Sequence, residues 1–253
     1  MISRLPGLSL PERAWGVVRR WALAWWRILY LGAVVCVLVL SPSSYGKVTR
    51  RALARHLYLD TAPVLLGFTV LAALISLVLT RIVIVTAISY GLSRYALEMV
   101  IRVLVLELIP LTAALFVAMR CTIPNGTQLA LLRQSGHLAR LSHAGADPIR
   151  VELLPRAVAG VFACITLAAL SCVVALVLAY LGVYGFSLAG LPSYTRMFGH
   201  VFAPAVTLVF VIKTVLFSLA VALIPMAAGL YDTGERTQPD SELGGLARMF
   251  AVL

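Results

Sequence analysis

Long apolar runs, separated by short polar or basic segments, organise this chain. A bilayer core of about 30 Å takes about 20 helical residues to cross. Four runs reach that length: Leu57–Thr80 (which could extend to Ile88), Tyr95–Met119, Leu153–Leu181 and Val201–Ala228. We therefore predict an all-α integral membrane protein. A last apolar stretch, Leu243–Leu253, is about 16 Å long as a helix, so we expect a short terminal helix or the start of a fifth span.

The apolar run Trp21–Leu40 has two interpretations. It contains one charge, Arg27, and by hydropathy alone it would be a spanning helix. Its start, however, mixes aromatic residues with arginines, as helices at the headgroup level do. We favour an interfacial or re-entrant helix and keep a membrane crossing as the alternative. On this basis we divide the chain into an N-terminal basic segment with this helix, residues 1–56, and a transmembrane domain, residues 57–253.

The charge of the loops favours the interfacial interpretation. Lysine and arginine gather in residues 1–20, in Lys47–Arg55 and in Arg120–Arg156, whereas Ser89–Arg94 and Gly182–His200 contain few of them. Cytoplasmic loops carry an excess of Lys and Arg. The basic and non-basic segments alternate consistently only if Trp21–Leu40 does not cross, and the basic segments are then cytoplasmic.

Composition supports a membrane protein and argues against other classes. Of 253 residues, 61% are hydrophobic and 12% are charged, whereas a soluble domain is about half apolar and a quarter charged. The net charge of +11 lies in loops beside apolar runs, where orientation and anionic lipid explain it, so we do not expect nucleic acid as a partner. The four cysteines form no CxxC pair, and we expect core packing rather than disulfides or a metal site: Cys36, Cys121, Cys164 and Cys172.

No enzyme motif is present in the sequence. It lacks GxxxxGK[ST], HExxH and GxSxG, so we predict no catalytic residues and no nucleotide bound through a P-loop. His137 and His143 share a loop without an acidic or cysteine partner at ligand spacing, and we interpret both as solvated histidines.

Charged residues inside the run Tyr95–Met119 are the first candidate site. Glu98 and Arg102 are four residues apart and therefore meet on one helix face, where we expect a local pair near the membrane surface. An ionisable group inside a span costs several kcal/mol unless it is paired or hydrated. Glu107 lies deeper, on the opposite face, and needs a partner. We expect Lys213, with Arg81 as a weaker candidate.

The pair Glu107–Lys213 leaves two roles open: a buried structural ion pair, or the polar part of a substrate cavity. Pro110 follows Glu107 in the same run. We expect this proline to loosen the helix at the acid.

The basic loop Arg120–Arg156 is the second candidate site. Pro124-Asn125-Gly126 should break the helix, and Gln128–His143 can then form a short amphipathic helix that ends at Gly145 and Asp147-Pro148. Leu131, Leu138 and Leu141 would share one side, and Arg133, His137 and Arg140 another. Such a helix either lies on the membrane or docks into a cytoplasmic ATPase as a coupling helix.

From about Arg51 to Gly244 the chain resembles the MlaE/YrbE permease family, the membrane subunits of MCE-type lipid ABC transporters. Five family motifs have counterparts in the right order. The motifs R-E-L-G-P, A-G-R-x-G, V-D-P, I-K-S-V-x-F and G-Y-D correspond to Leu106–Pro110, Ala118–Thr122, Ala146–Pro148, Ile212–Phe217 and Gly229–Asp232. Leu106 and Ile109 replace the family's Arg and Gly, and Gln128 stands at an acidic position, so the chain resembles a divergent member.

The resemblance implies an architecture and a set of partners. The fold would be an interfacial N-terminal helix followed by five spans, and two permease subunits would enclose a lipid cavity in the bacterial inner membrane. Two ATPase subunits, which hold ATP and Mg²⁺, would dock through the loop helix, and a periplasmic MCE-domain protein would sit above. No cofactor is expected in this chain.

The function implied is that of a permease subunit that moves phospholipid or a similar hydrophobic molecule. We expect the polar part of the cavity from Glu98, Arg102, Glu107 and Lys213, and ATPase coupling from Arg133, His137, Leu138, Arg140, Leu141 and Asp147. Two alternatives remain open. One is a secondary transporter with Glu107 and Lys213 as an ion relay. The other is a non-transporting scaffold paired with a standard permease, which the divergence at Leu106 and Ile109 would fit.

Overall fold

The computed structural model describes residues 10–41, 46–91, 93–231 and 247–253. Over these ranges the chain is helical and has no strand. Five helices in the described part are long and apolar enough to cross a membrane. The predicted all-α membrane fold is therefore confirmed, and the chain is a multi-pass membrane protein.

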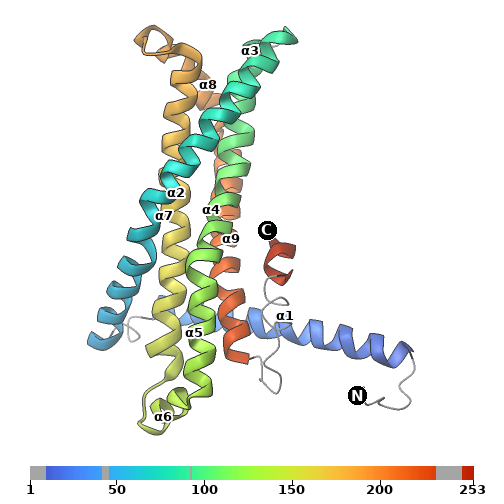
Figure 1. Cartoon of the computed structure of the whole chain (residues 1–253), viewed down its shortest axis with the longest axis vertical. Helices are drawn as coiled ribbons and strands as arrows, with labels where there is room; N and C mark the ends of the chain where they lie inside the picture. Colours follow the sequence, from blue (N-terminus) through green and yellow to red (C-terminus); the bar gives the residue numbers. More distant parts are fainter. Residues whose placement is uncertain (1–9, 42–45, 92, 232–246) are drawn as a thin grey trace, which may run out of the picture.

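Four long helical rods form the bundle and run along its long axis (Figure 1). The first is α2 (Lys47–Ser89), the third joins η4 (Ile149–Leu153) to α7 (Leu154–Tyr184), and the fourth is α9 (Pro204–Tyr231). The second rod is continuous and consists of α3 (Ser93–Val100), η2 (Ile101–Leu108), α4 (Ile109–Val117), η3 (Ala118–Thr122) and α5 (Ile123–Gln134). These rods correspond in number and order to the four predicted spans, although α2 begins at Lys47 rather than at Leu57.

The connections between the rods are short and partly helical. The predicted turn between the first two rods is present, and Gly91 there has a φ of 71°, which a glycine adopts without strain. The second and third rods are joined through α6 (His137–His143). Gly182–His200 was expected to be a loop, but it is largely helical, with η5 (Leu188–Gly190) and α8 (Leu191–Val201).

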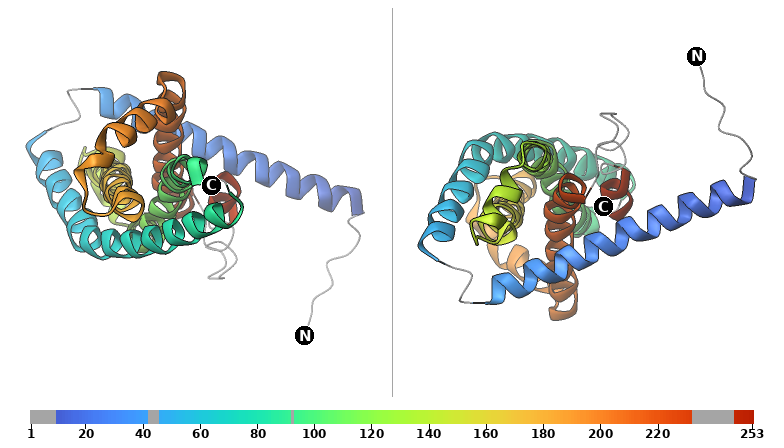
Figure 2. Two further views of the ribbon diagram at one scale, coloured as in Figure 1. Left: turned by 90° about the horizontal axis from the view of Figure 1, so that it is seen from above. Right: turned by 90° about the horizontal axis from the view of Figure 1, so that it is seen from below.

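Helix α1 (Leu10–Leu40) lies transverse to the rods, at the end of the bundle that holds α6 (Figures 1 and 2). Its C-terminal half packs on the bundle through a stripe of buried side chains at helical spacing: Ile28, Leu31, Val35 and Leu38. Its N-terminal half extends past the bundle (Figure 2). Since the rods are the membrane-crossing direction, a transverse α1 lies along the membrane surface, which favours the interfacial interpretation of Trp21–Leu40.

The basic segments meet at one end of the bundle. The start of α2, α6 and the connection to η4 all lie there, and the α2–α3 turn and α8 lie at the other end (Figure 1). We call these the basic end and the opposite end. The alternation of basic and non-basic loops predicted from the sequence is thus reproduced by the arrangement of the helices.

Three π-helical segments interrupt the rods, and each ends two residues before a proline. η2 precedes Pro110, η3 precedes Pro124 and η4 precedes Pro155. Proline has no N–H to donate, and its ring crowds the carbonyl four residues earlier. A wider turn just before the proline accommodates both effects without ending the helix. The predicted loosening at Pro110 is therefore confirmed.

The predicted helix break at Pro124-Asn125-Gly126 is wrong. The second rod continues through these residues to Gln134, because η3 absorbs the missing hydrogen bond of Pro124. The predicted helix Gln128–His143 is accordingly two elements: its first part belongs to α5, and its second part is α6. The loop predicted over Arg120–Arg156 shrinks to the segment around α6.

The glycine of that sequence serves a close helix contact instead. A Cβ on Gly126 of α5 would lie 2.6 Å from the carbonyl oxygen of Pro225 in α9, and a Cβ on Gly229 would lie 2.3 Å from the carbonyl oxygen of Gly126. Both distances are far below van der Waals contact. The backbones of α5 and α9 therefore touch directly near the basic end.

The C-terminal residues of the chain return to the bundle. The start of the predicted last helix, Leu243, lies outside the described residues. Residues 247–252 form a short helix, and the side chain of Met249 is fully buried against the main core.

Candidate functional site

Glu107 and Lys213 meet across two rods. Glu107 lies on η2 and Lys213 on α9, and the Lys213 Nζ donates to the Glu107 carboxylate. The ammonium also lies 5.6 Å from the centroid of the Phe217 ring, a favourable cation–π distance. The predicted partner of Glu107 is therefore confirmed.

This pair lies on the outer surface of the chain. The side chain of Glu107 is 66% exposed and that of Lys213 is 25% exposed, so the pair is not buried within this chain. Glu107 is about 15 Å along the rod from Leu97, and Lys213 is about 14 Å along α9 from Pro204. Both are near the middle of a 30 Å bilayer core. Lipid tails would make an exposed carboxylate there costly, so this face requires a polar or proteinaceous neighbour. We call Glu107–Lys213 the outward pair.

Glu98 and Arg102 form a second, separate pair. An Arg102 Nη2 lies 2.9 Å from the Glu98 Oε1, one turn apart on the same rod, and the two side chains are 26% and 49% exposed, in the order Glu98 and Arg102. This is the local pair expected from their spacing. Its place at the opposite end of the rod fits a position near the membrane surface.

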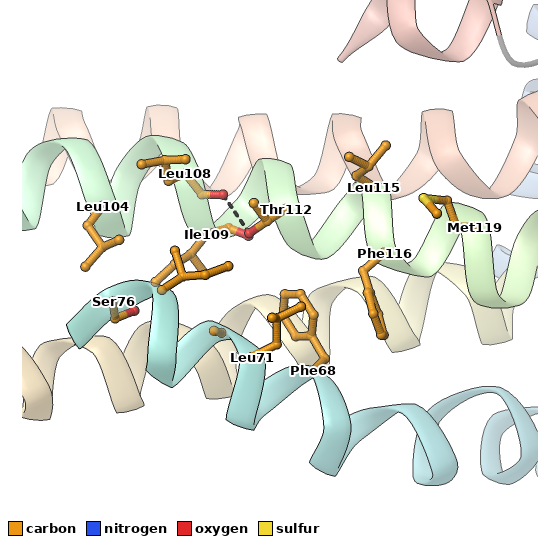
Figure 3. A pocket seen from close by; sticks show the side chains of 12 residues that line it. Phe68, Leu71, Ser76, Leu104, Leu108, Ile109, Thr112, Leu115, Phe116 and Met119 are labelled. Atoms are coloured by element: carbon orange, nitrogen blue, oxygen red, sulfur yellow. Dashed lines mark hydrogen bonds between the residues drawn. The ribbon is translucent and has the colours of Figure 1, made fainter. Parts of the chain in front are cut away.

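A small apolar cavity lies between α2 and the second rod (Figure 3). Its volume is about 180 Å³, and its walls include Phe68 and Phe116, whose ring centroids are 5.0 Å apart. Thr112 in the wall donates its hydroxyl to the carbonyl of Leu108, so the cavity presents little polarity. Ligand pockets are usually about 300–1,000 Å³, which makes this space large enough for part of an acyl chain only. This cavity could not be predicted from the sequence, because its lining is apolar like the rest of the spans.

Helix α6 projects at the basic end between two sharp turns. Gly136 before it has a φ of 70°, and Gly145 after it has a φ of 77°. The Ala146 N–H donates to the carbonyl of Leu141, and the Gly145 N–H to that of Ser142, which closes the C-terminus. Both glycines are in the left-handed region that other residues avoid. The sequence therefore fixes where α6 begins and ends.

The predicted coupling residues are distributed over α5, α6 and the segment after it. On α6, Leu138 packs against the main core and Leu141 is half-buried, while Arg140 is exposed and donates to the nearby carbonyl of Ser135. The outer face of α6 is formed by Ala139, Arg140, Ser142 and His143, all exposed. Arg140 is thus the predicted residue best placed to meet a partner.

Arg133 and Asp147 hold α6 from both sides. The Arg133 Nη1 donates to the carbonyl of Leu230 at the end of α9, at 2.7 Å. The Asp147 carboxylate accepts from the N–H of Ile149, the first residue of η4, at 3.0 Å, and it also lies 3.5 Å from the Nε of Arg150. These contacts fit residues that position α6 within the chain.

Sequence reasoning missed a group of polar residues behind α6. His137 on α6 faces Glu152 on η4, and Glu152 binds the buried Arg156 on α7. Nearby, the Asn125 amide donates to the Asp60 carboxylate at 2.9 Å, and His56 lies within electrostatic reach of Arg156, Asp60 and Glu152. We call these six residues the junction cluster: His56, Asp60, Asn125, His137, Glu152 and Arg156. The available signals were two spacings of four residues, His56 to Asp60 and Glu152 to Arg156.

The connection between α7 and α8, at the opposite end, is held by close contacts and exposes apolar side chains. The Tyr180 hydroxyl donates to the carbonyl of Ser187 at 2.5 Å, and a Cβ on Gly190 would lie 2.3 Å from the ring of Tyr184. Between these contacts, Phe186 is 96% exposed. A connection that exposes an aromatic side chain in this way is suited to contact a partner or the headgroup layer.

Comparison with known families matches most of the chain to one model. The family described as Permease MlaE matches residues 53–241, about three quarters of the length. The match contains the outward pair, α6 and the whole junction cluster. None of the curated proteins compared with the chain matches it.

Proposed function

Because the chain belongs to the MlaE permease family, we propose that it moves phospholipid or a similar hydrophobic molecule between the bacterial inner membrane and a periplasmic MCE-domain protein. As a member of this family it is an ABC transporter permease, a membrane subunit and not itself a catalytic enzyme. A cytoplasmic ABC ATPase would supply the energy, and ATP and Mg²⁺ would bind in that partner.

The observation that carries the proposal is the shape of the basic end. Helix α6 is short, bounded by two glycines with positive φ, and presents an exposed face with Arg140 and His143. Excess Lys and Arg favours the cytoplasmic side for this end. A rigid exposed helix on that side is a suitable contact for a motor subunit.

The outward pair supports a second subunit. An exposed carboxylate in mid-membrane is costly against lipid tails, and a second permease chain on this face would cover it. The space between the two chains would then contain Glu107 and Lys213 as its polar part, suited to a lipid headgroup. The apolar cavity beside η2 would accept part of an acyl chain.

A test of ATPase docking uses charge reversal on α6. We expect Arg140→Glu to reduce the ATPase that co-purifies with the chain by about tenfold, or about 1.4 kcal/mol, because like charges across an interface repel. Arg196→Glu, on the exposed surface of α8 at the opposite end, is the matched control and should leave co-purification unchanged. Equal retention in both variants contradicts docking through α6.

The two alternative functions make different predictions. An ion relay at Glu107 and Lys213 would support transport in ATP-free vesicles under an ion gradient, which a permease driven by an ATPase would not show. A scaffold subunit would tolerate Glu107→Ala without any loss of lipid transfer.

A further inference from the structure

We propose that Glu152 and Arg156, together with His137, position α6 and couple its movement to α2 and α7. This inference rests on the proposed function of α6 as the ATPase contact. It assigns a role to three polar residues of the junction cluster, of which only His137 was expected near the coupling helix. The three side chains form a connected path that runs from the surface of α6 into the bundle.

The buried end of this path is Arg156. Its side chain is 8% exposed, and its Nη1 donates to both the side chain of Glu152, at 2.5 Å, and the backbone carbonyl of Glu152, at 2.7 Å. Its Nε is buried and has no hydrogen-bond partner among the described residues. An arginine stays charged in proteins, and a buried charge needs compensation. Glu152 is therefore the residue on which the burial of Arg156 depends.

Glu152 uses its two carboxylate oxygens in two directions. Oε2 binds Arg156, and Oε1 lies 3.7 Å from the Nε2 of His137, the first residue of α6. The exposure of the three side chains rises along this path, from 8% at Arg156 to 21% at Glu152 and 40% at His137. The Arg156 end of the path is thus fixed in the bundle, and the His137 end can move with α6.

The buried end also reaches the neighbouring helices. His56 of α2 lies within electrostatic reach of both Arg156 and Glu152. Asp60, one turn further along α2, interacts with Arg156 and accepts the hydrogen bond from Asn125 of α5. A displacement of Glu152 would therefore alter the electrostatic environment at α2 and α7 together. Polar networks in a low-dielectric setting are sensitive to the loss of one member.

The segment that carries Glu152 is suited to movement. It lies on η4, where the wide turn before Pro155 has replaced the regular helical hydrogen bonds. The hydrogen bond from Ile149 to Asp147 and the two glycines around α6 define the connection between α6 and η4. The pair Glu152–Arg156 then determines the angle at which α6 meets the bundle.

The first experiment measures the mobility of α6 in the permease chain without the ATPase. A spin label at Ser142, on the exposed face of α6, reports the mobility of the helix after Cys36, the one exposed cysteine, has been replaced by Ser. We expect Glu152→Gln to give a markedly more mobile spectrum than wild type. Arg196→Gln, which removes a charge at the opposite end, should give the wild-type spectrum. An ordered label in Glu152→Gln would overturn the positioning role.

The second experiment measures coupling in the complex with the ATPase, reconstituted in liposomes. We expect Glu152→Gln to raise the ATP hydrolysed per lipid moved by about fivefold or more, within the usual range for coupling between sites. The KM for ATP and the amount of bound ATPase should stay unchanged, since neither the nucleotide site nor the outer face of α6 is altered. A ratio within twofold of wild type contradicts the proposal.

Conservative variants separate this role from a loss of folding. His137→Gln should show the same defect more weakly, and His137→Arg should restore coupling, because a guanidinium can reach Oε1 of Glu152. These two His137 variants test the inference even if Glu152→Gln does not fold. Equal coupling in the two variants contradicts the inference. A wild-type chain that binds no ATPase would instead remove the proposed function, and the coupling role with it.

Discussion

Two acidic residues occupy the same local setting in this chain and have opposite surroundings. Glu107-Leu108-Ile109-Pro110 and Glu152-Leu153-Leu154-Pro155 each place a carboxylate in a π-helical turn three residues before a proline. Glu152 binds a buried arginine of its own rod, whereas Glu107 binds Lys213 of another rod on the outer surface. Local sequence sets the geometry of both, and the neighbouring helices decide their roles.

The different surroundings of the two acids suggest different roles, positioning of α6 for Glu152 and transport for Glu107. The Glu152–Arg156 pair is enclosed by the chain, so its loss should be felt as instability and poor coupling. The outward pair is 66% exposed at Glu107 and is incomplete without a neighbour, so its loss should be felt in transport. The experiments below test this contrast, from the largest expected effect to the smallest.

Removing the buried arginine should have the largest effect on stability. We expect Arg156→Gln to lower the free energy of unfolding by about 3 kcal/mol, because it leaves the Glu152 carboxylate without its partner. Lys213→Met, which breaks the outward pair, should change it by about 1 kcal/mol or less for the purified chain under conditions in which water reaches the exposed Glu107 carboxylate. Thermal or denaturant unfolding of the purified chain measures both. Equal losses would remove the contrast between the two pairs.

The glycine contact of α5 with α9 joins the two regions, since α5 carries Asn125 of the junction cluster and α9 carries Lys213. Gly229→Ala would place a Cβ 2.3 Å from the carbonyl oxygen of Gly126, and we expect a loss of about 2 kcal/mol from overpacking. Gly67→Ala on α2 has no neighbour within 4 Å and should be neutral or stabilising, since alanine favours the helix. A tolerated Gly229→Ala would show that this crossing is looser than described.

Transport should depend on the outward pair. We expect Lys213→Met to reduce lipid transfer about tenfold, or about 1.4 kcal/mol, with ATPase binding retained. The exchange of both charges, Glu107→Lys with Lys213→Glu, should recover part of the activity, because the pair re-forms with opposite polarity. Lipid transfer from labelled liposomes measures this. Unchanged transfer in Lys213→Met would favour the scaffold alternative.

The smallest effect is expected in the apolar cavity. The hydroxyl of Ser76 is buried in its wall without a hydrogen-bond partner among the described residues. We expect Ser76→Ala to change stability by about 0.5 kcal/mol or less, since no bond is lost. A loss above about 1 kcal/mol would reveal a polar partner for this hydroxyl in the membrane.

Hydropathy and charge were sufficient for much of the fold. The four rods follow from apolar runs of about 20 or more residues, and the turn at Gly91 follows from a strong turn former. The gathering of basic segments at one end follows from the charge of the loops. The pairing of Glu107 with Lys213 was also predictable, because an ionised group in a span requires a partner. The coupling and cavity roles of the predicted residues remain predictions.

The errors came from treating local signals alone. Pro124 and Gly126 are helix breakers by propensity, but a π turn and contact with α9 keep them within one rod. The exposure of Glu107 could not be predicted, because it depends on how α9 crosses η2. The junction cluster was missed because its members come from five separate segments, and only two pairs within it are close in sequence, His56 with Asp60 and Glu152 with Arg156.

Site-specific crosslinking on α6 tests the central claim most directly. A photoreactive amino acid at Ser142, on the exposed face of α6 at the basic end, would be activated in intact cells, and the crosslinked protein identified by mass spectrometry. We predict capture of an ABC ATPase at Ser142 and none at Leu191, which lies at the opposite end. Capture of the ATPase at Leu191 but not at Ser142 would contradict the account.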